Sequence, residues 1–228
     1  MYIPTKLVVS DIHEIHRFID HHGFGLIVGN GSDNDDTGAK DNVGNTLGNH
    51  KKKGIEGTHL SFILNKEEGE YGTLYCHFAR INPHWASLAG EEVLVVFHGP
   101  HAYISPTWYA SEPNVPTWNY TAVHVYGELT VLSDEKTLEV MEKTVKKYEP
   151  QLWDNQSVMP TAYREKLQKA VVACKITLTR VEAQYKLGQQ RKEEDQQGVA
   201  EGLSQCEDLD SIGLLNFMQQ TRIGMGKA

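Results

Sequence analysis

Short segments with alternating apolar and polar residues constrain the fold of this chain more than any other feature. Segments of this kind lie at 58–64, 71–79, 92–99, 102–105 and 117–132, and glycine or proline punctuates the sequence between them. A period of two residues is typical of half-buried β-strands. Strands that follow one another so closely favour an antiparallel barrel, which also removes exposed sheet edges.

Helical periodicity occurs only outside these alternating segments. It predicts helices at 10–22, at 134–148, after Pro160 and at 191–203, with a last strand at 174–187. The predicted fold class is therefore mainly β, an α+β barrel with peripheral helices. Residues 1–203 form one predicted domain, and residues 204–228 form a C-terminal tail.

Residues 29–54 differ in composition from the rest of the chain. They contain six Gly, five Asn, four Asp and only three apolar residues. Such a segment cannot bury enough apolar surface to offset the entropy of ordering it. We predict a flexible insertion between two strands.

Composition also bounds the class of protein. No apolar run reaches the roughly 18 residues of a membrane span, and the net charge of −8 disfavours binding to nucleic acid or anionic membranes. The three cysteines form no CxxC pair, which predicts free thiols in a cytoplasmic protein. The sequence contains no GxSxG, Walker or GxGxxG motif, so hydrolase, P-loop and Rossmann functions lack support.

The segment 97–126 has an unusual composition for a loop-rich region. It contains seven aromatic residues, three His and four Pro but only one formal charge, Glu112. Stiff, uncharged aromatic segments can hold a planar ligand, and they can equally form a dimer interface. Ser105, Trp108 and Trp118 are its candidate ligand-binding residues. The dipeptide between His98 and His101 is Gly-Pro, which predicts a turn.

The string ARINPHW at 79–85 gathers an Arg, an Asn, a His and a Trp within seven residues. Arg80 could bind a phosphate or carboxylate in a bidentate manner, Asn82 could contact the edge of a ring, and Trp85 could offer a planar face. The alternative is structural, with Arg80 in a salt bridge across the barrel and a turn stabilised by proline.

Two histidines on neighbouring predicted strands are further candidates. His59 and His77 could ligate a metal or a haem iron, or hydrogen-bond a cofactor ring, if both face the inside of the barrel. The alternative for each is a core histidine with satisfied hydrogen bonds. Alternation on 71–79 places Cys76 on the opposite face from His77.

The string YKLGQQR at 185–191 follows the last predicted strand. It offers Lys186, Gln189 and Arg191, and a basic residue paired with an amide there could meet the phosphate or carboxylate of a ligand in the barrel. The alternative is a solvated strand end that leads into a helix cap.

Several long strings together resemble the PaiB family, whose members are often described as FMN-binding negative transcriptional regulators. The matching strings, in family order, are MYIP, FGLIV, THLSFIL, CHFARINPHW, VVFHGPHAYISPTWY, VPTWNYTAVHVYGEL and YKLGQQR. The resemblance extends through about residue 203 and excludes the 29–54 insertion. Against the family pattern KLSQNR, this chain has Gly188 for Ser and Gln190 for Asn, and Ser61 replaces the usual Pro of THLPF.

The resemblance implies a split β-barrel of the FMN-binding type that forms a homodimer with its cofactor at the subunit interface. FMN is the favoured cofactor, in a redox or redox-sensing role. The family also contains haem-dependent piperazate synthases, which form an N–N bond from N-hydroxylated ornithine, so haem b is the alternative. His59 would then be the first candidate for the iron ligand and His77 the second. A third possibility is a regulatory or interaction protein without a cofactor.

Overall fold

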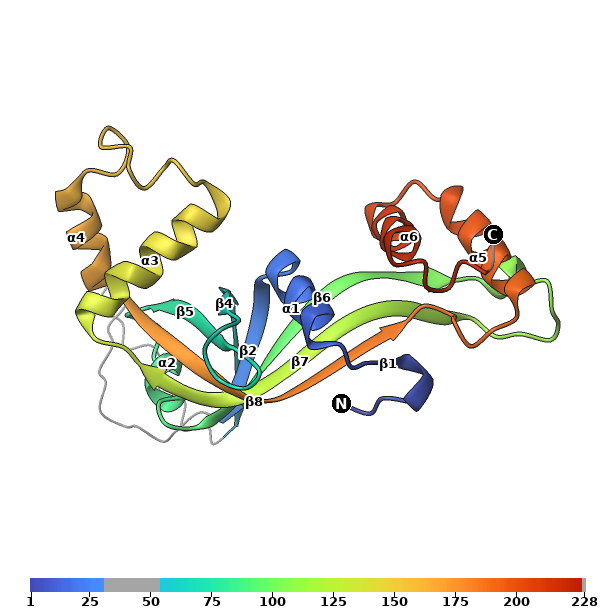
Figure 1. Cartoon of the computed structure of the whole chain (residues 1–228), viewed down its shortest axis with the longest axis horizontal. Helices are drawn as coiled ribbons and strands as arrows, with labels where there is room; N and C mark the ends of the chain where they lie inside the picture. Colours follow the sequence, from blue (N-terminus) through green and yellow to red (C-terminus); the bar gives the residue numbers. More distant parts are fainter. Residues whose placement is uncertain (31–53, 227–228) are drawn as a thin grey trace. The chain divides into compact units, whose positions relative to one another are not determined.

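The computed structural model describes residues 1–30 and 54–226, and within them the chain has the expected α+β architecture. Eight strands form one antiparallel sheet in the order β3-β2-β6-β7-β8-β5-β4, and β1 pairs with β8 (Figure 1). The ends of this order, β3 and β4, are not sheet neighbours in the described residues, so the sheet stays open as in a split barrel. The strands are β1 Val8–Val9, β2 Phe24–Asn30, β3 Ile55–Ser61, β4 Ile63–Asn65, β5 Thr73–Ala79, β6 Glu92–Ile104, β7 Thr117–Val131 and β8 Val171–Lys186.

The described helices lie where the periodicity predicts them, with two additions. They are α1 Ile12–His21, α2 His84–Ser87, α3 Asp134–Tyr148, α4 Thr161–Ala170, α5 Glu193–Ser204 and α6 Leu209–Thr221, with 3₁₀ turns η1 Thr5–Leu7 and η2 Pro106–Trp108. The added helices are the short α2 and, in the predicted tail, α6. None of the described helices is long and apolar enough to cross a membrane, and the expected cytoplasmic location stays a prediction.

The chain divides into two compact units. Among the described residues, unit 1 contains 1–18, 98–124 and 182–226, and unit 2 contains 19–30, 54–97 and 125–181. The long strands β6, β7 and β8 contribute residues to both units. A domain boundary at residue 203 stays a prediction.

The core of unit 2 is built on the pairing of β5 with β8. Leu74 lies opposite Ile176 and Cys76 opposite Cys174, and all four side chains are fully buried. Tyr75 and His77, on the other face of β5, are only half-buried. The predicted alternation on this strand is therefore confirmed.

A second apolar cluster in unit 2 lies beneath the helices. Met141 of α3 packs with Trp153 and Met159 from the connection between α3 and α4. The Ser133 side chain caps α3 by accepting a hydrogen bond from the Lys136 backbone N–H. This cap and the first-turn acidic residues explain why α3 begins where the sequence predicts.

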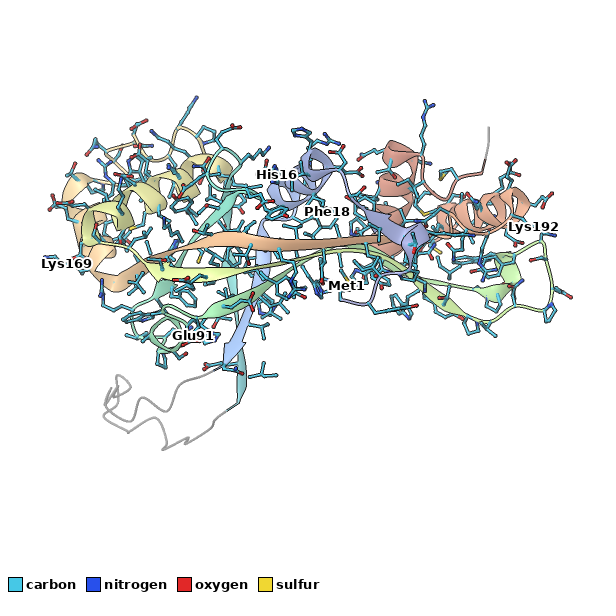
Figure 2. All side chains as sticks on the ribbon, turned by 60° about the horizontal axis from the view of Figure 1, so that its bottom comes forward. Met1, His16, Phe18, Glu91, Lys169 and Lys192 are labelled. Atoms are coloured by element: carbon cyan, nitrogen blue, oxygen red, sulfur yellow. The ribbon has the colours of Figure 1, made fainter. Side chains whose placement is uncertain are left out.

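Three aromatic rings form the centre of unit 1. Phe18 of α1 (Figure 2) lies 5.7 Å from Tyr185 of β8 and 6.3 Å from Phe217 of α6, measured between ring centroids. Tyr185 and Phe217 make an edge-to-face contact at 5.1 Å. Since Leu214 and Met218 of α6 are also fully buried, the segment after residue 203 is part of this core.

The expected turn at His98–His101 is wrong, because β6 runs through it without a break. Glycine is needed at position 99 for packing and not for a turn, because a Cβ there would lie 2.7 Å from the Phe18 ring. β2 pairs only with Leu94–Val96 of β6. Pro100 has no backbone N–H to donate, and it lies beyond this paired stretch, so its presence costs β2 no hydrogen bond. The segment predicted as one strand at 58–64 is instead divided at Phe62 into β3 and β4.

The insertion predicted at 29–54 lies almost entirely outside the described residues. β2 extends to Asn30 and β3 begins at Ile55, so the described chain confirms only that strands flank the insertion.

Candidate functional site

The structure divides the candidate residues between the two units. Unit 2 holds His59, His77, Arg80, Asn82 and Trp85, and unit 1 holds Ser105, Trp108, Trp118, Lys186 and Gln189. Each group is therefore described within its own unit.

The Arg80 guanidinium in unit 2 is bound to the backbone. Its Nε donates to the Lys169 carbonyl at 2.8 Å and its Nη2 to the Val171 carbonyl at 2.9 Å. The Arg80 carbonyl accepts a hydrogen bond from the Trp85 indole N–H at 3.2 Å. These contacts fasten the junction of α4 and β8, and they favour a structural role for Arg80. Its predicted role in binding phosphate stays a prediction.

Asn82 belongs to a polar network that includes His84, the imidazole of the ARINPHW string. Asn82 Oδ1 accepts from the His84 backbone N–H at 3.0 Å, which orients the amide so that Nδ2 faces Thr58 Oγ1 at 3.3 Å. The same hydroxyl lies 2.8 Å from His84 Nδ1. His84 is fully buried, its Nε2 has no hydrogen-bond partner among the described residues, and burial lowers the pKa of its imidazole. The only sequence signal was its place in NPHW.

The two candidate haem ligands lie in different surroundings. His59 is exposed on β3 and stacks on the Phe24 ring at 5.8 Å. His77 is half-buried on β5, and burial lowers the pKa of its imidazole. Neither faces the buried side of the sheet that Cys76 occupies. Of the two, His59 is the imidazole that a ligand from solvent could reach.

Unit 1 carries an exposed cluster that we call the aromatic face: His101 and Tyr103 of β6 with Trp118 and Tyr120 of β7. On both strands these residues alternate with buried ones. Trp118 is 53% exposed and Tyr103 is 47% exposed, and the Trp118 ring lies 6.0 Å from His101 and 6.3 Å from Tyr103. Such exposure of large rings is typical of a ligand or partner surface.

Lys186 adjoins the aromatic face. Its ammonium donates to Thr117 Oγ1 at 2.6 Å and to the Trp118 carbonyl at 2.7 Å, and lies 6.0 Å from the centre of the Tyr120 ring. Burial lowers the pKa of Lys186, and the nearby positive charge of Arg191 lowers it further.

Arg191, the last residue of the YKLGQQR string, lies in the same unit as Lys186. Its guanidinium lies 3.7 Å above the centre of the Tyr109 ring, and Nη1 donates to Asn114 Oδ1 at 2.8 Å. The buried Asp195 carboxylate, whose pKa is lowered by hydrogen bonds from the backbone and by the charge of Arg191, offsets part of this positive charge. Two cations and one carboxylate still leave a net positive charge, which favours an anion.

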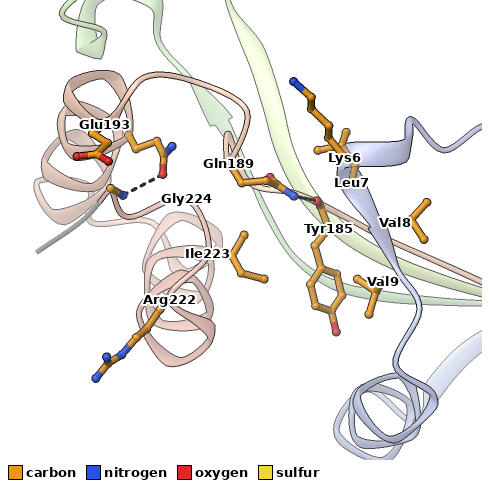
Figure 3. Close-up of a pocket in the computed structure, with 12 residues that line it drawn as sticks. Lys6, Leu7, Val8, Val9, Tyr185, Gln189, Glu193, Arg222, Ile223 and Gly224 are labelled. Carbon is orange, nitrogen blue, oxygen red and sulfur yellow. Dashed lines mark hydrogen bonds between the residues drawn. The ribbon is translucent and has the colours of Figure 1, made fainter.

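The remaining candidates of unit 1 make structural contacts. Ser105 Oγ caps η2 by accepting from the Thr107 backbone N–H, and Trp108 packs against the glycines of α5. The Gln189 amide folds back on its own loop, accepting from the Leu187 N–H at 2.8 Å and donating to the Tyr185 carbonyl at 2.6 Å. Gln189 also lines a cavity (Figure 3).

Gly188 explains one departure from the family pattern. Its φ of +80° lies in the left-handed region that favours glycine. The backbone of the loop that carries Gln189 and Arg191 is therefore suited to a glycine at position 188.

Within residues 1–30 and 54–226, no group of three or more His, Cys, Asp and Glu side chains is arranged to hold a metal ion. The candidate chemistry of the described residues is therefore that of aromatic rings, cations and single imidazoles.

Two solved structures share this fold. A FAD and heme binding protein from Mycobacterium smegmatis superimposes with a TM-score of 0.56 at 11% identity, over 80% of this chain and 74% of that one. The flavocytochrome Anf3 from Azotobacter vinelandii superimposes with a TM-score of 0.55 at 12% identity, over 81% and 72% of the two chains. At these identities the likeness concerns the fold alone.

Sequence comparisons extend further. The family model described as "Putative FMN-binding domain" matches residues 1–180. "Protease synthase and sporulation protein PAI 2" of Bacillus subtilis is 36% identical over 225 residues, which cover 96% of this chain and 97% of the relative. An uncharacterized protein of Emericella nidulans is 29% identical over 187 residues, covering 65% and 74% of the two chains. Because the model matches most of the chain and the Bacillus protein matches nearly all of it, this protein belongs to the PaiB family of FMN-binding-domain proteins.

Proposed function

We propose that the protein binds FMN, with the flavin ring on the aromatic face and the phosphate near Lys186 and Arg191. The observation that carries this proposal is the pair of cations next to the exposed Trp118. Membership in the family of FMN-binding domains supports the choice of cofactor, as do the names of the two structural neighbours, which describe flavin-containing proteins.

The residues present fit such a cofactor. A flavin ring is planar and apolar enough to stack on the exposed Trp118 ring, and Tyr103, whose ring plane lies at 78° to that of Trp118, would meet the edge of the flavin. A phosphate would offset the repulsion between Lys186 and Arg191, and Arg191 could bind it in a bidentate manner. Bound FMN would supply electron-transfer chemistry, in a redox or redox-sensing role. The chain itself would orient the ring and neutralise the phosphate.

We also propose that the protein is a homodimer with the cofactor at the subunit interface. The aromatic face is a large apolar surface for a single chain, and Val115 in the preceding loop is a further 70% exposed. Aromatic residues are enriched in protein–protein interfaces. A second copy would cover the flavin as well as these side chains.

Reconstitution of the purified chain with FMN tests the proposal. We expect stoichiometric uptake with a flavin absorption band near ~450 nm. Lys186→Gln should raise the dissociation constant about ten- to hundredfold, since a charge-assisted hydrogen bond contributes about 1.5–3 kcal/mol. Trp118→Ala should weaken binding by a similar amount through loss of the stacking surface. Lys169→Gln, which removes an exposed cation in unit 2, is the charge-matched control and should bind FMN like the wild type. Equal affinity in all three variants would refute the assigned site.

Haem is the second candidate cofactor, and His59 is the observation that favours it. Its imidazole is exposed, and the stacked Phe24 ring holds its orientation. One structural neighbour is named as a heme-binding protein. If the chain takes up haem b, as a piperazate-synthase-type enzyme would, His59→Ala should abolish or shift the Soret band near ~400 nm, whereas His77→Ala should leave it in place.

The same titrations decide between the classes of function. Stoichiometric uptake of FMN with no uptake of haem would remove the haem-dependent alternative. Uptake of neither would leave a regulatory or interaction protein without a cofactor.

A further inference from the structure

A cavity of about 510 Å³ lies in unit 1, apart from the residues of the aromatic face (Figure 3). Val8 and Val9 of β1 lie on one side of it and Ile223 on the other, with the Tyr185 ring between them in this view. Its volume falls within the range of about 300–1,000 Å³ that is usual for pockets that bind small molecules.

Backbone constraints build this cavity. Gly224 has a φ of +74°, and a Cβ there would lie 2.1 Å from the Leu187 carbonyl oxygen, so only glycine allows the segment after α6 to approach the end of β8. The Gly226 backbone N–H donates to Gln196 Oε1 of α5 at 2.9 Å. The side of the cavity that carries Ile223 is therefore held at two points.

The polar lining of the cavity separates into satisfied amides and charged side chains. Gln189 uses its amide within its own loop, and Gln196 both accepts from Gly226 and donates to the Arg191 carbonyl at 2.8 Å. The charged lining residues are Lys6, Arg222 and Glu193, two cations and one carboxylate. The net charge of the lining is therefore positive, whereas the net charge of the whole chain is −8.

We propose that this cavity binds a small carboxylic acid with an aliphatic body. The branched side chains of Val8, Val9 and Ile223 would enclose the body, and the carboxylate would lie at the mouth. Lys6 and Arg222 extend from the rim on different sides (Figure 3), and both are exposed and long enough to turn toward an anion there. The site is separate from the proposed flavin site, so each can be tested while the other is monitored.

Methyl NMR of the full-length chain, titrated with octanoate, tests the proposal. We expect saturable shifts of the Val8, Val9 and Ile223 methyl signals, and much weaker shifts with octylammonium, which has the same body and the opposite charge. The double variant Lys6→Gln/Arg222→Gln should weaken octanoate binding about three- to tenfold, since each exposed charge contributes up to about 1 kcal/mol.

Cavity-filling variants complete the test. Ile223→Trp should abolish octanoate binding, and Ile212→Trp, on an exposed position of α6, is the matched control that should retain it. If Ile223→Trp fails to fold, Val8→Glu replaces it, since Val8 is 47% exposed and a carboxylate there should repel octanoate. No saturable shift of the three methyl groups, or equal binding of octanoate and octylammonium, would overturn the proposal. FMN uptake by the same variants, measured in parallel, reports on the flavin site independently.

Discussion

Cys76 and Cys174 face one another across β5 and β8, and both are fully buried. Burial raises the pKa of both thiols, that of Cys174 to about 12, and the proximity of Cys174 adds to the effect on Cys76. A thiol that stays protonated is a weak nucleophile. At the scale of single residues, this pair therefore packs as two small apolar side chains, in agreement with the free thiols predicted from the sequence.

Thiol titration should distinguish these cysteines from Cys206, which is only half-buried. We expect Ellman's reagent at pH 8 to modify one thiol per native chain, that of Cys206, and all three only after unfolding in urea. Cys206→Ser should remove the fast phase. Rapid modification of two or three thiols in the native protein would show that the β5–β8 core opens easily.

The buried imidazole of His84 predicts a pH dependence of stability. Burial lowers its pKa below the 6.5 of an ordinary histidine, so below pH 6.5 the unfolded chain binds a proton more readily than the folded chain. The free energy of unfolding should therefore be constant with respect to this group above pH 6.5 and fall as the pH falls toward the lower folded pKa.

Urea midpoints measured between pH 7.5 and pH 5 check this. His84→Gln, whose amide can still reach Thr58 but does not titrate, should show a smaller decline than the wild type. Identical slopes in the two proteins would mean that His84 does not contribute. Other histidines with lowered pKa values, such as His77, remain in both proteins and cancel in the comparison.

At the scale of elements, α5 packs directly against Trp108, and two glycines of the helix, Gly198 and Gly202, make the contact. A Cβ at Gly198 would lie 2.0 Å from the Trp108 carbonyl oxygen, and one at Gly202 would lie 2.3–2.6 Å from atoms of its indole ring. The helix can approach Trp108 this closely only because neither position has a side chain. This contact fixes the position of Trp108 within the segment 97–126.

Gly202→Ala should therefore destabilise the protein by about 1–3 kcal/mol through overpacking, despite the higher helix propensity of alanine. Gly213→Ala on α6 is the matched control, because the nearest atom to its Cβ would be 4.0 Å away. We expect that control to gain up to about 1 kcal/mol. Denaturant unfolding of the two variants measures both effects, and a neutral Gly202→Ala would show that Trp108 can move aside.

At the scale of the whole molecule, the aromatic face predicts association. Its exposed rings, Trp118 and Tyr103, would be covered in a homodimer. The predicted dimer would have twice the 25.6 kDa mass of the chain.

Light scattering at micromolar concentration should give this doubled mass, and Trp118→Glu should shift the protein toward the monomer. Val158→Glu, at an exposed apolar position in the α3–α4 connection, is a control that should remain dimeric. A wild-type mass of 25.6 kDa would contradict the dimer and would leave the aromatic face as a ligand surface of the single chain.

Local signals in the sequence determined much of this fold. The helix predicted at 134–148 has the same bounds as α3, because its cap, its first-turn acids and its apolar stripe all lie within the segment itself. The strands predicted at 71–79 and 117–132 are present as Thr73–Ala79 and Thr117–Val131, within two residues of the predicted bounds, since alternation depends on immediate neighbours. The long strings shared with the PaiB family likewise depend on the sequence alone.

Tertiary structure decided what the candidate residues contact. The Arg80 side chain meets a carbonyl 89 positions along the chain, and no local pattern encodes that partner. Gly99 seemed a turn signal by itself, but it is a packing position because Phe18 lies against it. The cavity beside Ile223 forms only when the segment after α6 returns to β1. Periodicity and caps are set by residues a few positions apart, whereas hydrogen-bond partners and cavities depend on which distant segments the sheet and helices bring together.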